Sequence, residues 1–280
     1  MKILRVLNTN AIVTLDEKNQ EIIVTGAGIG FKKKRGDLVD KSQIDKVYCL
    51  KNDEFNKRLQ NIVENISEKY LNITGKVVDA AKKSGIKTND ILYVTLTDHI
   101  NSAIERYKSD IHLKNILKLD IQKFYSQEYI IGKQAVIWIA KETGIDLGDD
   151  EAAFIAMHIV SSELDNSLTS DVQKMTELIN SILKIIRISF KIDFNEESIS
   201  YQRFITHLKF FAARIMTDTE YKDSMNEIYE VMINQNPKAV SGVEKIKQLI
   251  KKEYNHELSV DESLYLLIHI KRLLDEQNID

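Results

Sequence analysis

Two histidines of this chain follow acidic residues at the same spacing, in segments that align without a gap. The segments are ETGIDLGDDEAAFIAMHI (142–159) and EYNHELSVDESLYLLIHI (253–270), in which Glu, Leu, Asp-Glu and His-Ile match. Glu151 precedes His158 by seven residues, and Glu262 precedes His269 by seven. Residues seven apart share one face of a helix. We therefore expect each carboxylate below its histidine, where it can orient the ring and favour its protonated form.

A second histidine stands upstream in each copy, and an arginine follows it by seven residues. LTDHINSAIER (96–106) contains His99 and Arg106, and ITHLKFFAAR (205–214) contains His207 and Arg214. A guanidinium on the same helix face can hold an anionic group that the histidine carries. The sequence therefore predicts two copies of one module with two histidines each, and only His112 and His256 fall outside this scheme.

The spacing of the four histidines leaves a structural and a functional role open. A histidine on an apolar helix is more often a packed residue, and common ancestry of the two copies could preserve all four for packing. A zinc site is the weaker functional interpretation, because the sequence has no HExxH motif, no cysteine pair and no histidines at ligand spacing. It also has no nucleophile elbow or oxyanion motif. We expect a protein that is not an enzyme and holds no cofactor and no metal.

The elements that must position these histidines are helices. Apolar residues recur at spacings of three and four from Glu54 onward, which predicts an all-helical region over residues 54–280. Clear examples are EFNKRLQNIVENISEKYL (54–71), VQKMTELINSILKIIRISF (172–190) and VEKIKQLIKKEY (243–254). Pro237 lies between two such segments, where it would end one helix and allow the next to begin.

The first 51 residues have the composition of β-strands instead. Four short runs rich in β-branched or apolar residues, KILRVLN, NAIVTL, EIIVTG and KVYCLK, predict a small antiparallel sheet. A sheet domain of this size buries little surface, so we expect it to dimerise. The predicted fold class is α+β multidomain, with this β domain at residues 1–55 and all-α helical-bundle modules at 64–168 and 169–280. The polar stretches LKNDEFNK and SELDNSLTSD are the expected joints.

The glycine-rich segment GAGIGF (26–31) is a poor nucleotide-binding loop, because no GK[ST] and no helical pattern follow it. We interpret it as a tight exposed loop whose glycines let another backbone approach closely. Phe31 and the basic run 32–35 come next, and aromatic stacking with phosphate neutralisation is how proteins hold single-stranded or distorted RNA. A solvated basic turn is the alternative interpretation. Arg5, Asn8 and Asn10 add groups suited to base edges and phosphates.

Charge and composition exclude several classes of protein. Residues 1–55 hold ten Lys/Arg and eight Asp/Glu, and the whole chain has a net charge of -3, so it is not a generic polycation. Cys49 is the single cysteine, which excludes a disulfide framework within the chain and a cysteine-based zinc cluster. No signal-peptide pattern and no stretch near the roughly 20 apolar residues of a membrane span is present. We expect a cytoplasmic protein without membrane insertion.

The whole chain resembles the bacterial transcriptional antiterminators that control sucrose and β-glucoside operons. MKILRVLNTNAIV and GAGIGFKKKRGDLVD are similar to the co-antiterminator RNA-binding domain of that family. TDHI, DDEAAFIAMHI, RFITHLKFFAAR and DESLYLLIHI are similar to its two tandem regulatory domains of the phosphotransferase system. The motifs occur in the right order in both halves, and the resemblance covers essentially all 280 residues.

This resemblance implies a homodimer whose N-terminal domain binds a partly paired RNA hairpin in the nascent transcript. The hairpin excludes an overlapping terminator, so transcription continues into sugar-utilisation genes. By motif, the RNA-contact residues are Arg5, Asn8, Asn10, Gly26, Ala27, Gly28 and Phe31. Some members have a basic residue where this chain has Ala27, which leaves the hairpin preference open.

The resemblance also implies phosphorylation by the sugar phosphotransferase system on His99, His158, His207 and His269. In this family the first module is usually inhibited through a sugar-specific permease, and the second is activated in many members through the general carrier HPr. The expected surroundings of the phosphohistidines are Asp98, Arg106, Glu151, Arg214 and Glu262. A phosphohistidine carries roughly two negative charges, which two facing subunits would repel or an arginine would capture. We expect this to bias a bistable dimer whose active form brings both RNA domains together.

Two alternatives remain at this point. A DNA-binding activator with the same regulatory modules would need a helix-turn-helix at the N-terminus, where the sequence predicts strands. A histidine phosphocarrier would pass phosphate onward, and it would leave the N-terminal domain without a role.

Overall fold

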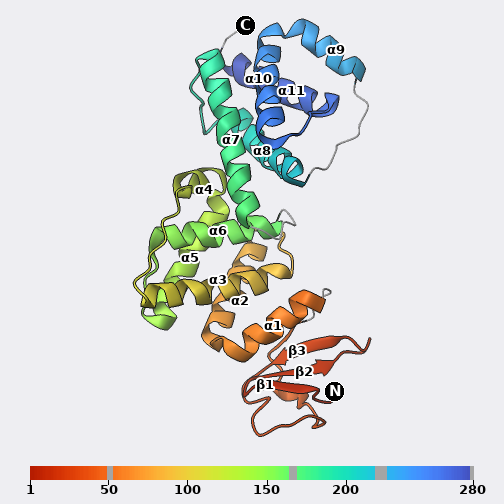
Figure 1. The fold of residues 1–280 in the computed structure, drawn as a ribbon, viewed down its shortest axis with the longest axis vertical. Helices are drawn as coiled ribbons and strands as arrows, with labels where there is room; N and C mark the ends of the chain where they lie inside the picture. Colours follow the sequence, from red (N-terminus) through yellow and green to blue (C-terminus); the bar gives the residue numbers. More distant parts are fainter. Residues whose placement is uncertain (49–52, 164–168, 218–225, 278–280) are drawn as a thin grey trace. The chain divides into compact units, whose positions relative to one another are not determined.

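The structure is a computed structural model, and it describes residues 1–48, 53–163, 169–217 and 226–277 (Figure 1). The chain divides into two compact units, Met1–Ser167 and Leu168–Asp280. Cys49, the end of the predicted strand KVYCLK and parts of both predicted joints lie outside the described residues. The predicted domain boundaries at 55, 64 and 168 stay predictions.

The first unit begins with a four-stranded antiparallel sheet in the order β1-β2-β3-β4, as the sequence predicted. Its strands are β1 (Arg5–Asn8), β2 (Ala11–Leu15), β3 (Glu21–Thr25) and β4 (Lys46–Tyr48), and a short 3-10 helix, η1 (Lys41–Gln43), precedes β4. Strands rather than a helix-turn-helix therefore occupy the described N-terminal segment, which does not favour a DNA-binding activator.

Alternate residues of the sheet enter two different cores. Ile12 pairs with Val24, and both pack with Ile29 on one face of the sheet. Val13 pairs with Ile23, and both pack on the other face against helical residues. This period of two is the expected pleat of a strand, and burial on both faces explains why the runs are almost continuously apolar.

Six helices follow in the described part of the first unit. They are α1 (Asp53–Asn65), α2 (Glu68–Lys83), α3 (Ile91–Lys108), α4 (Lys118–Phe124), α5 (Ser126–Thr143) and α6 (Gly148–Glu163). The apolar run 54–71 is not one continuous helix, because the chain breaks at Ser67, which has an extended ψ of 132° and stands at the N-cap of α2. Serine is common at this position, and here its side chain makes no capping hydrogen bond.

Helix α6, which carries His158, is held in position by close packing against α5. A Cβ atom on Gly132 of α5 would lie 2.2 Å from the backbone oxygen of Ala152 in α6, so only glycine allows this approach. Helix α6 also packs against α3, which carries His99. The two predicted histidines of the first module therefore come from neighbouring helices.

The second unit consists of helices in its described residues, as predicted. They are α7 (Thr169–Phe190), α8 (Ile199–Thr217), α9 (Asn226–Gln235), α10 (Pro237–Tyr254) and α11 (Val260–Glu276). Pro237 is the first residue of α10, as its position between two helical patterns predicted. Helix α11 begins with a capping box in which Ser259 and Glu262 each accept a hydrogen bond from the other's backbone N–H. Among the described residues, no helix combines the length and apolar character that crossing a membrane requires.

Candidate RNA-binding surface and histidine sites

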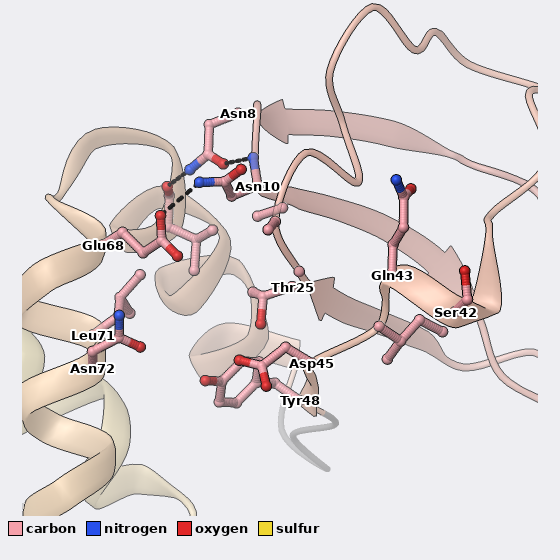
Figure 2. A pocket seen from close by; sticks show the side chains of 15 residues that line it. Asn8, Asn10, Thr25, Ser42, Gln43, Asp45, Tyr48, Glu68, Leu71 and Asn72 are labelled. Atoms are coloured by element: carbon pink, nitrogen blue, oxygen red, sulfur yellow. Dashed lines mark hydrogen bonds between the residues drawn. The ribbon is translucent and has the colours of Figure 1, made fainter.

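Four of the predicted RNA-contact residues lie around one cavity of about 550 Å³ at the edge of the sheet (Figure 2). Asn8 ends β1, Asn10 lies in the turn to β2, and Gly26 and Ala27 begin the loop after β3. Because β1, β2 and β3 are neighbours in the sheet, residues that are 18 positions apart in the sequence meet at this edge.

Hydrogen bonds from the two asparagines fix the local backbone. Asn8 Oδ1 accepts a bond of 2.8 Å from the N–H of Asn10, and Asn10 Oδ1 accepts one of 2.8 Å from the N–H of Gly28. Gly28 has a φ of +71°, which favours glycine. A Cβ on Gly26 would lie 1.7 Å from the backbone oxygen of Gln43, which confirms the expected close approach of another backbone.

Arg5, Gly28 and Phe31 do not belong to the described lining of this cavity. Phe31 is 58% exposed, and Lys32 Nζ lies 5.4 Å from the centroid of its ring. The rest of the basic run, Lys33 to Arg35, is also exposed. The structure thus presents a cavity lined by both asparagines and a separate exposed aromatic-basic loop, and both are suited to RNA by the chemistry of their side chains.

The donor groups of three predicted RNA-contact side chains face the junction between α1 and α2. Asn8 Nδ2 donates to the backbone oxygen of Val63 at 2.6 Å, and Asn10 Nδ2 donates to Glu68 Oε2 at 2.6 Å (Figure 2). Arg5 Nε lies 3.9 Å from Glu64 Oε1. The sequence interpretation missed these partners, because they come from the predicted all-helical region, which no sequence pattern placed against the strands.

The first histidine site joins α3 and α6. The ring centroids of His99 and His158 lie 4.6 Å apart, and Asp98 and Arg106 line the same cleft of about 680 Å³. Glu151 is buried, and its Oε1 lies 2.6 Å from His99 Nε2 and 3.5 Å from Arg106 Nη2. The expected neighbour of Glu151 was His158 on its own helix, whereas the contact that the structure describes is with His99 on the facing helix.

Desolvation controls the charge of His158. Burial and the neighbouring His99 together hold the pKa of His158 well below its usual value, although part of its surface reaches solvent. The ring is therefore neutral near pH 7, and a neutral imidazole nitrogen has the lone pair that a phosphoryl group requires.

The second histidine site has the same pairing of rings but different surroundings. His207 of α8 and His269 of α11 have ring centroids 4.8 Å apart, and Tyr265 lies against both. His207 is exposed, whereas His269 is buried. Burial, with His207 and Arg272 as smaller causes, lowers the pKa of His269 to about 4.

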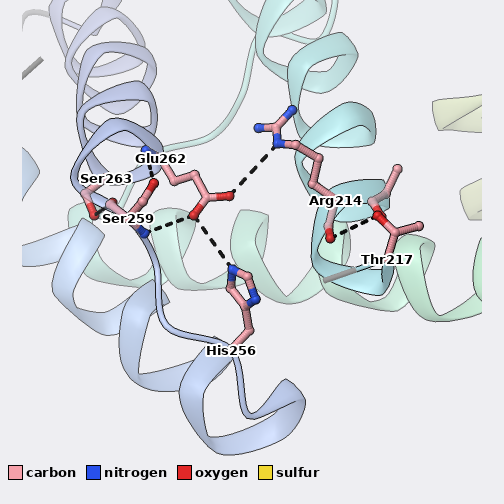
Figure 3. Close-up of polar contacts among 7 residues, drawn as sticks. Arg214, Thr217, His256, Ser259, Glu262 and Ser263 are labelled. Carbon is pink, nitrogen blue, oxygen red and sulfur yellow. Dashed lines mark hydrogen bonds and ion pairs between the residues drawn. The ribbon is translucent and has the colours of Figure 1, made fainter. Parts of the chain in front are cut away.

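Glu262 contacts a histidine that the sequence scheme left out. Its Oε2 lies 3.7 Å from His256 Nε2 and accepts a hydrogen bond of 3.0 Å from the N–H of Ser259, while its Oε1 lies 4.0 Å from Arg214 Nε (Figure 3). The expected neighbour of Glu262 was His269 on its own helix, whereas the structure places its carboxylate beside Arg214 and His256. The signal of His256 in the sequence was weak, because the aligned position of the first copy is Ile145.

Family models match the chain in three places. A model of the CAT RNA binding domain matches residues 1–57, and a model of the PRD domain matches residues 77–162 and 180–273. Transcription antiterminator LicT of Bacillus subtilis (strain 168) is 38% identical over 277 residues, which cover 99% of this chain and 100% of that protein. The beta-glucoside operon antiterminator of Dickeya chrysanthemi is 35% identical over 277 residues, with 99% and 98% covered.

A solved structure supports the same fold. The crystal structure of GlcT CAT-PRDI is 31% identical to this chain with a TM-score of 0.50, and the match covers 57% of this chain and 96% of the solved one. The predicted fold class and the family resemblance are thereby confirmed. With both domain types matched in order and relatives aligned over nearly its whole length, this chain belongs to the family of transcription antiterminators that join a CAT RNA binding domain to PRD domains.

Proposed function

We propose that this chain binds a partly paired RNA hairpin in a nascent transcript and thereby prevents termination upstream of sugar-utilisation genes. The observation that carries this proposal is the cavity at which Asn8, Asn10, Gly26 and Ala27 meet. Asparagine amides and loop backbone groups read the base edges of unpaired nucleotides, and the exposed Phe31 can stack on a base. The names of the relatives, among them a beta-glucoside operon antiterminator, support the same function.

The test is binding of the full chain to a bulged RNA hairpin, against a fully paired RNA hairpin and duplex DNA of matching sequence, over a salt titration. We expect preference for the bulged hairpin at every salt concentration, because recognition by shape and bases does not vanish with screening. Phe31→Ala should lower the affinity for the bulged hairpin about tenfold, since stacking contributes ~1–3 kcal/mol per base. Equal binding to all three nucleic acids would contradict the proposal.

We further propose that His99, His158, His207 and His269 accept phosphoryl groups from the sugar phosphotransferase system. The paired rings in both units support this role, with centroid distances of 4.6 Å and 4.8 Å. A phosphoryl group on His99 Nε2 would bring roughly two negative charges against Glu151, which lies 2.6 Å away. The carboxylate must then move, and Arg106 can transfer its guanidinium from Glu151 to the phosphate.

The remaining parts of the proposal concern partners. The chain acts as a cytoplasmic homodimer with domains at 1–55, 64–168 and 169–280, and receives phosphate from HPr and from a sugar-specific permease. Phosphorylation of the purified chain by each donor, with single His→Ala variants at the four positions, tests the sites by the loss of label. Sedimentation of each phosphorylated form tests the dimer. Transfer of label from this chain to a permease would favour the phosphocarrier alternative, and no label at any of the four histidines would contradict this part.

A further inference from the structure

The edge of the sheet that carries Arg5, Asn8 and Asn10 already has an occupant in this structure. All three side chains direct donor groups at the segment 63–68, and all three partner groups are oxygen acceptors: the Val63 backbone oxygen, Glu64 Oε1 and Glu68 Oε2. The three distances are 2.6 Å, 3.9 Å and 2.6 Å in that order. RNA would present the same kinds of group to these side chains, because phosphate and base oxygens are acceptors.

The break between α1 and α2 creates this acceptor segment. Val63 and Glu64 belong to the last turn of α1, where backbone carbonyl groups lack helical partners. Glu68 is the first residue of α2, where a carboxylate is stabilised by the helix dipole. A continuous helix through Ser67 would satisfy the Val63 carbonyl internally, so the break is what leaves this backbone acceptor available beside the carboxylates of Glu64 and Glu68.

Apolar packing beneath the edge holds the segment against the sheet. Leu59, Ile62 and Val63 of α1 and Leu71 of α2 are buried in one core with Ala11, Val13 and Ile23 of the sheet. Glu64 and Glu68 themselves are exposed. The packing below them therefore holds the backbone that carries these carboxylates, and substitution of either carboxylate should leave the fold intact.

We infer that this edge is an interaction surface with two mutually exclusive occupants, RNA and the acidic 63–68 segment of the chain itself. The inference rests on the proposed RNA contacts of Arg5, Asn8 and Asn10. Glu68 lines the cavity together with both asparagines, so a base edge or phosphate that enters there meets a carboxylate (Figure 2). RNA binds only when Asn10 Nδ2 and Arg5 exchange their acidic partners for RNA oxygens, and Glu64 and Glu68 thereby weaken RNA binding by the full chain.

The first test compares RNA affinity of full-length double variants with equal charge. Glu64→Gln/Glu68→Gln removes both competing carboxylates, and Glu105→Gln/Glu227→Gln removes two exposed carboxylates elsewhere. We expect the first variant to bind a bulged RNA hairpin about five- to tenfold more tightly than the second, because competition by charged acceptors is lost in addition to general repulsion. Equal affinity of the two variants, with unchanged unfolding midpoints, would overturn the inference.

The second test uses the wild-type full chain and amide hydrogen exchange. Saturating RNA should speed exchange of peptides that span residues 61–72, because their contacts with Asn8 and Asn10 are released, while peptides from 174–186 in α7 stay unchanged. Slower or unchanged exchange at 61–72 would overturn the inference. If neither the wild type nor either double variant prefers the bulged over the fully paired hairpin, the proposed RNA function itself fails. If the chain instead prefers the bulged hairpin but its affinity does not depend on Glu64 and Glu68, only the present inference fails and the proposed RNA function stands.

Discussion

His256 and Glu262 form a contact in the second unit, with Nε2 and Oε2 3.7 Å apart, that the first unit replaces by another arrangement. There the equivalent carboxylate, Glu151, lies 2.6 Å from His99, and the position aligned with His256 is Ile145. The two copies therefore share their histidine pairs but differ in which histidine the buried carboxylate contacts. The proposed phosphorylation of His99 would disturb a buried carboxylate, whereas that of the exposed His207 would meet a different environment.

His256→Ala should lower the free energy of unfolding of the second unit by about 1–3 kcal/mol, because it removes a buried partner of the buried Glu262. His207→Ala is the matched control, and we expect it to cost less than about 0.5 kcal/mol because its side chain is exposed. Urea unfolding followed by far-UV circular dichroism measures both. An effect of His207→Ala as large as that of His256→Ala would contradict this role of His256.

Glu151→Gln should lower the free energy of unfolding of the first unit by about 1–3 kcal/mol, since Glu151 is buried against His99 and Arg106. Asp149→Asn removes a half-exposed carboxylate that pairs with Lys133 on the surface, and should change stability by less than about 0.5 kcal/mol. The single tryptophan, Trp138, lies in α5 and reports unfolding of the first unit by fluorescence. Equal effects of the two substitutions would contradict the buried pairing.

Stability of the second unit should fall as pH decreases from about 6.5 to about 4. The pKa of His269 is lowered to about 4 in the folded chain, so in this window the unfolded chain binds a proton that the folded chain does not. The loss should reach roughly 2–3 kcal/mol at the acid end, and above about pH 6.5 this residue adds no pH dependence. His269→Gln should remove this part of the slope in urea unfolding, while His112→Gln, at an exposed ring, should keep it. An unchanged slope in His269→Gln would refute the assignment.

Ala27→Arg should strengthen RNA binding without loss of stability. Ala27 is exposed on the lining of the cavity, so the new side chain has room to reach a phosphate. We expect affinity for the bulged hairpin to rise several-fold and the slope of log affinity against log salt to steepen by about one, as for one added phosphate contact. Ala27→Gln controls for size without charge. An identical salt slope in Ala27→Arg and Ala27→Gln would place this position outside reach of the RNA backbone.

The strands and most helices could be predicted from the sequence because their patterns are local. The pleat of Ile12 and Val13 and the helix start at Pro237 depend on near neighbours in the chain. The break at Ser67 was not predicted, because the apolar spacing of 54–71 continues across it.

The predicted histidine pairs were found as neighbours, but their polar partners could not be derived from spacing alone. Spacing along one helix placed Glu151 near His158, while the contact with His99 arises from packing of α3 against α6. The contact between His256 and Glu262 also depends on the tertiary fold. His256 precedes α11 and reaches Glu262 only through the conformation of the loop between α10 and α11. Contacts between elements depend on the whole core, which no local pattern encodes.

The clash that any side chain at Gly26 would make with Gln43 also affects how sequence variation in this region should be interpreted. A survey of random variants selected only for soluble expression would lose every substitution at Gly26, whereas the adjacent Ala27 would accept most residues. If relatives always had glycine at the position of Gly26, the reason would thus be that folding requires it. The fold leaves Ala27 unconstrained, so variation among relatives at this position would reflect differences in RNA preference.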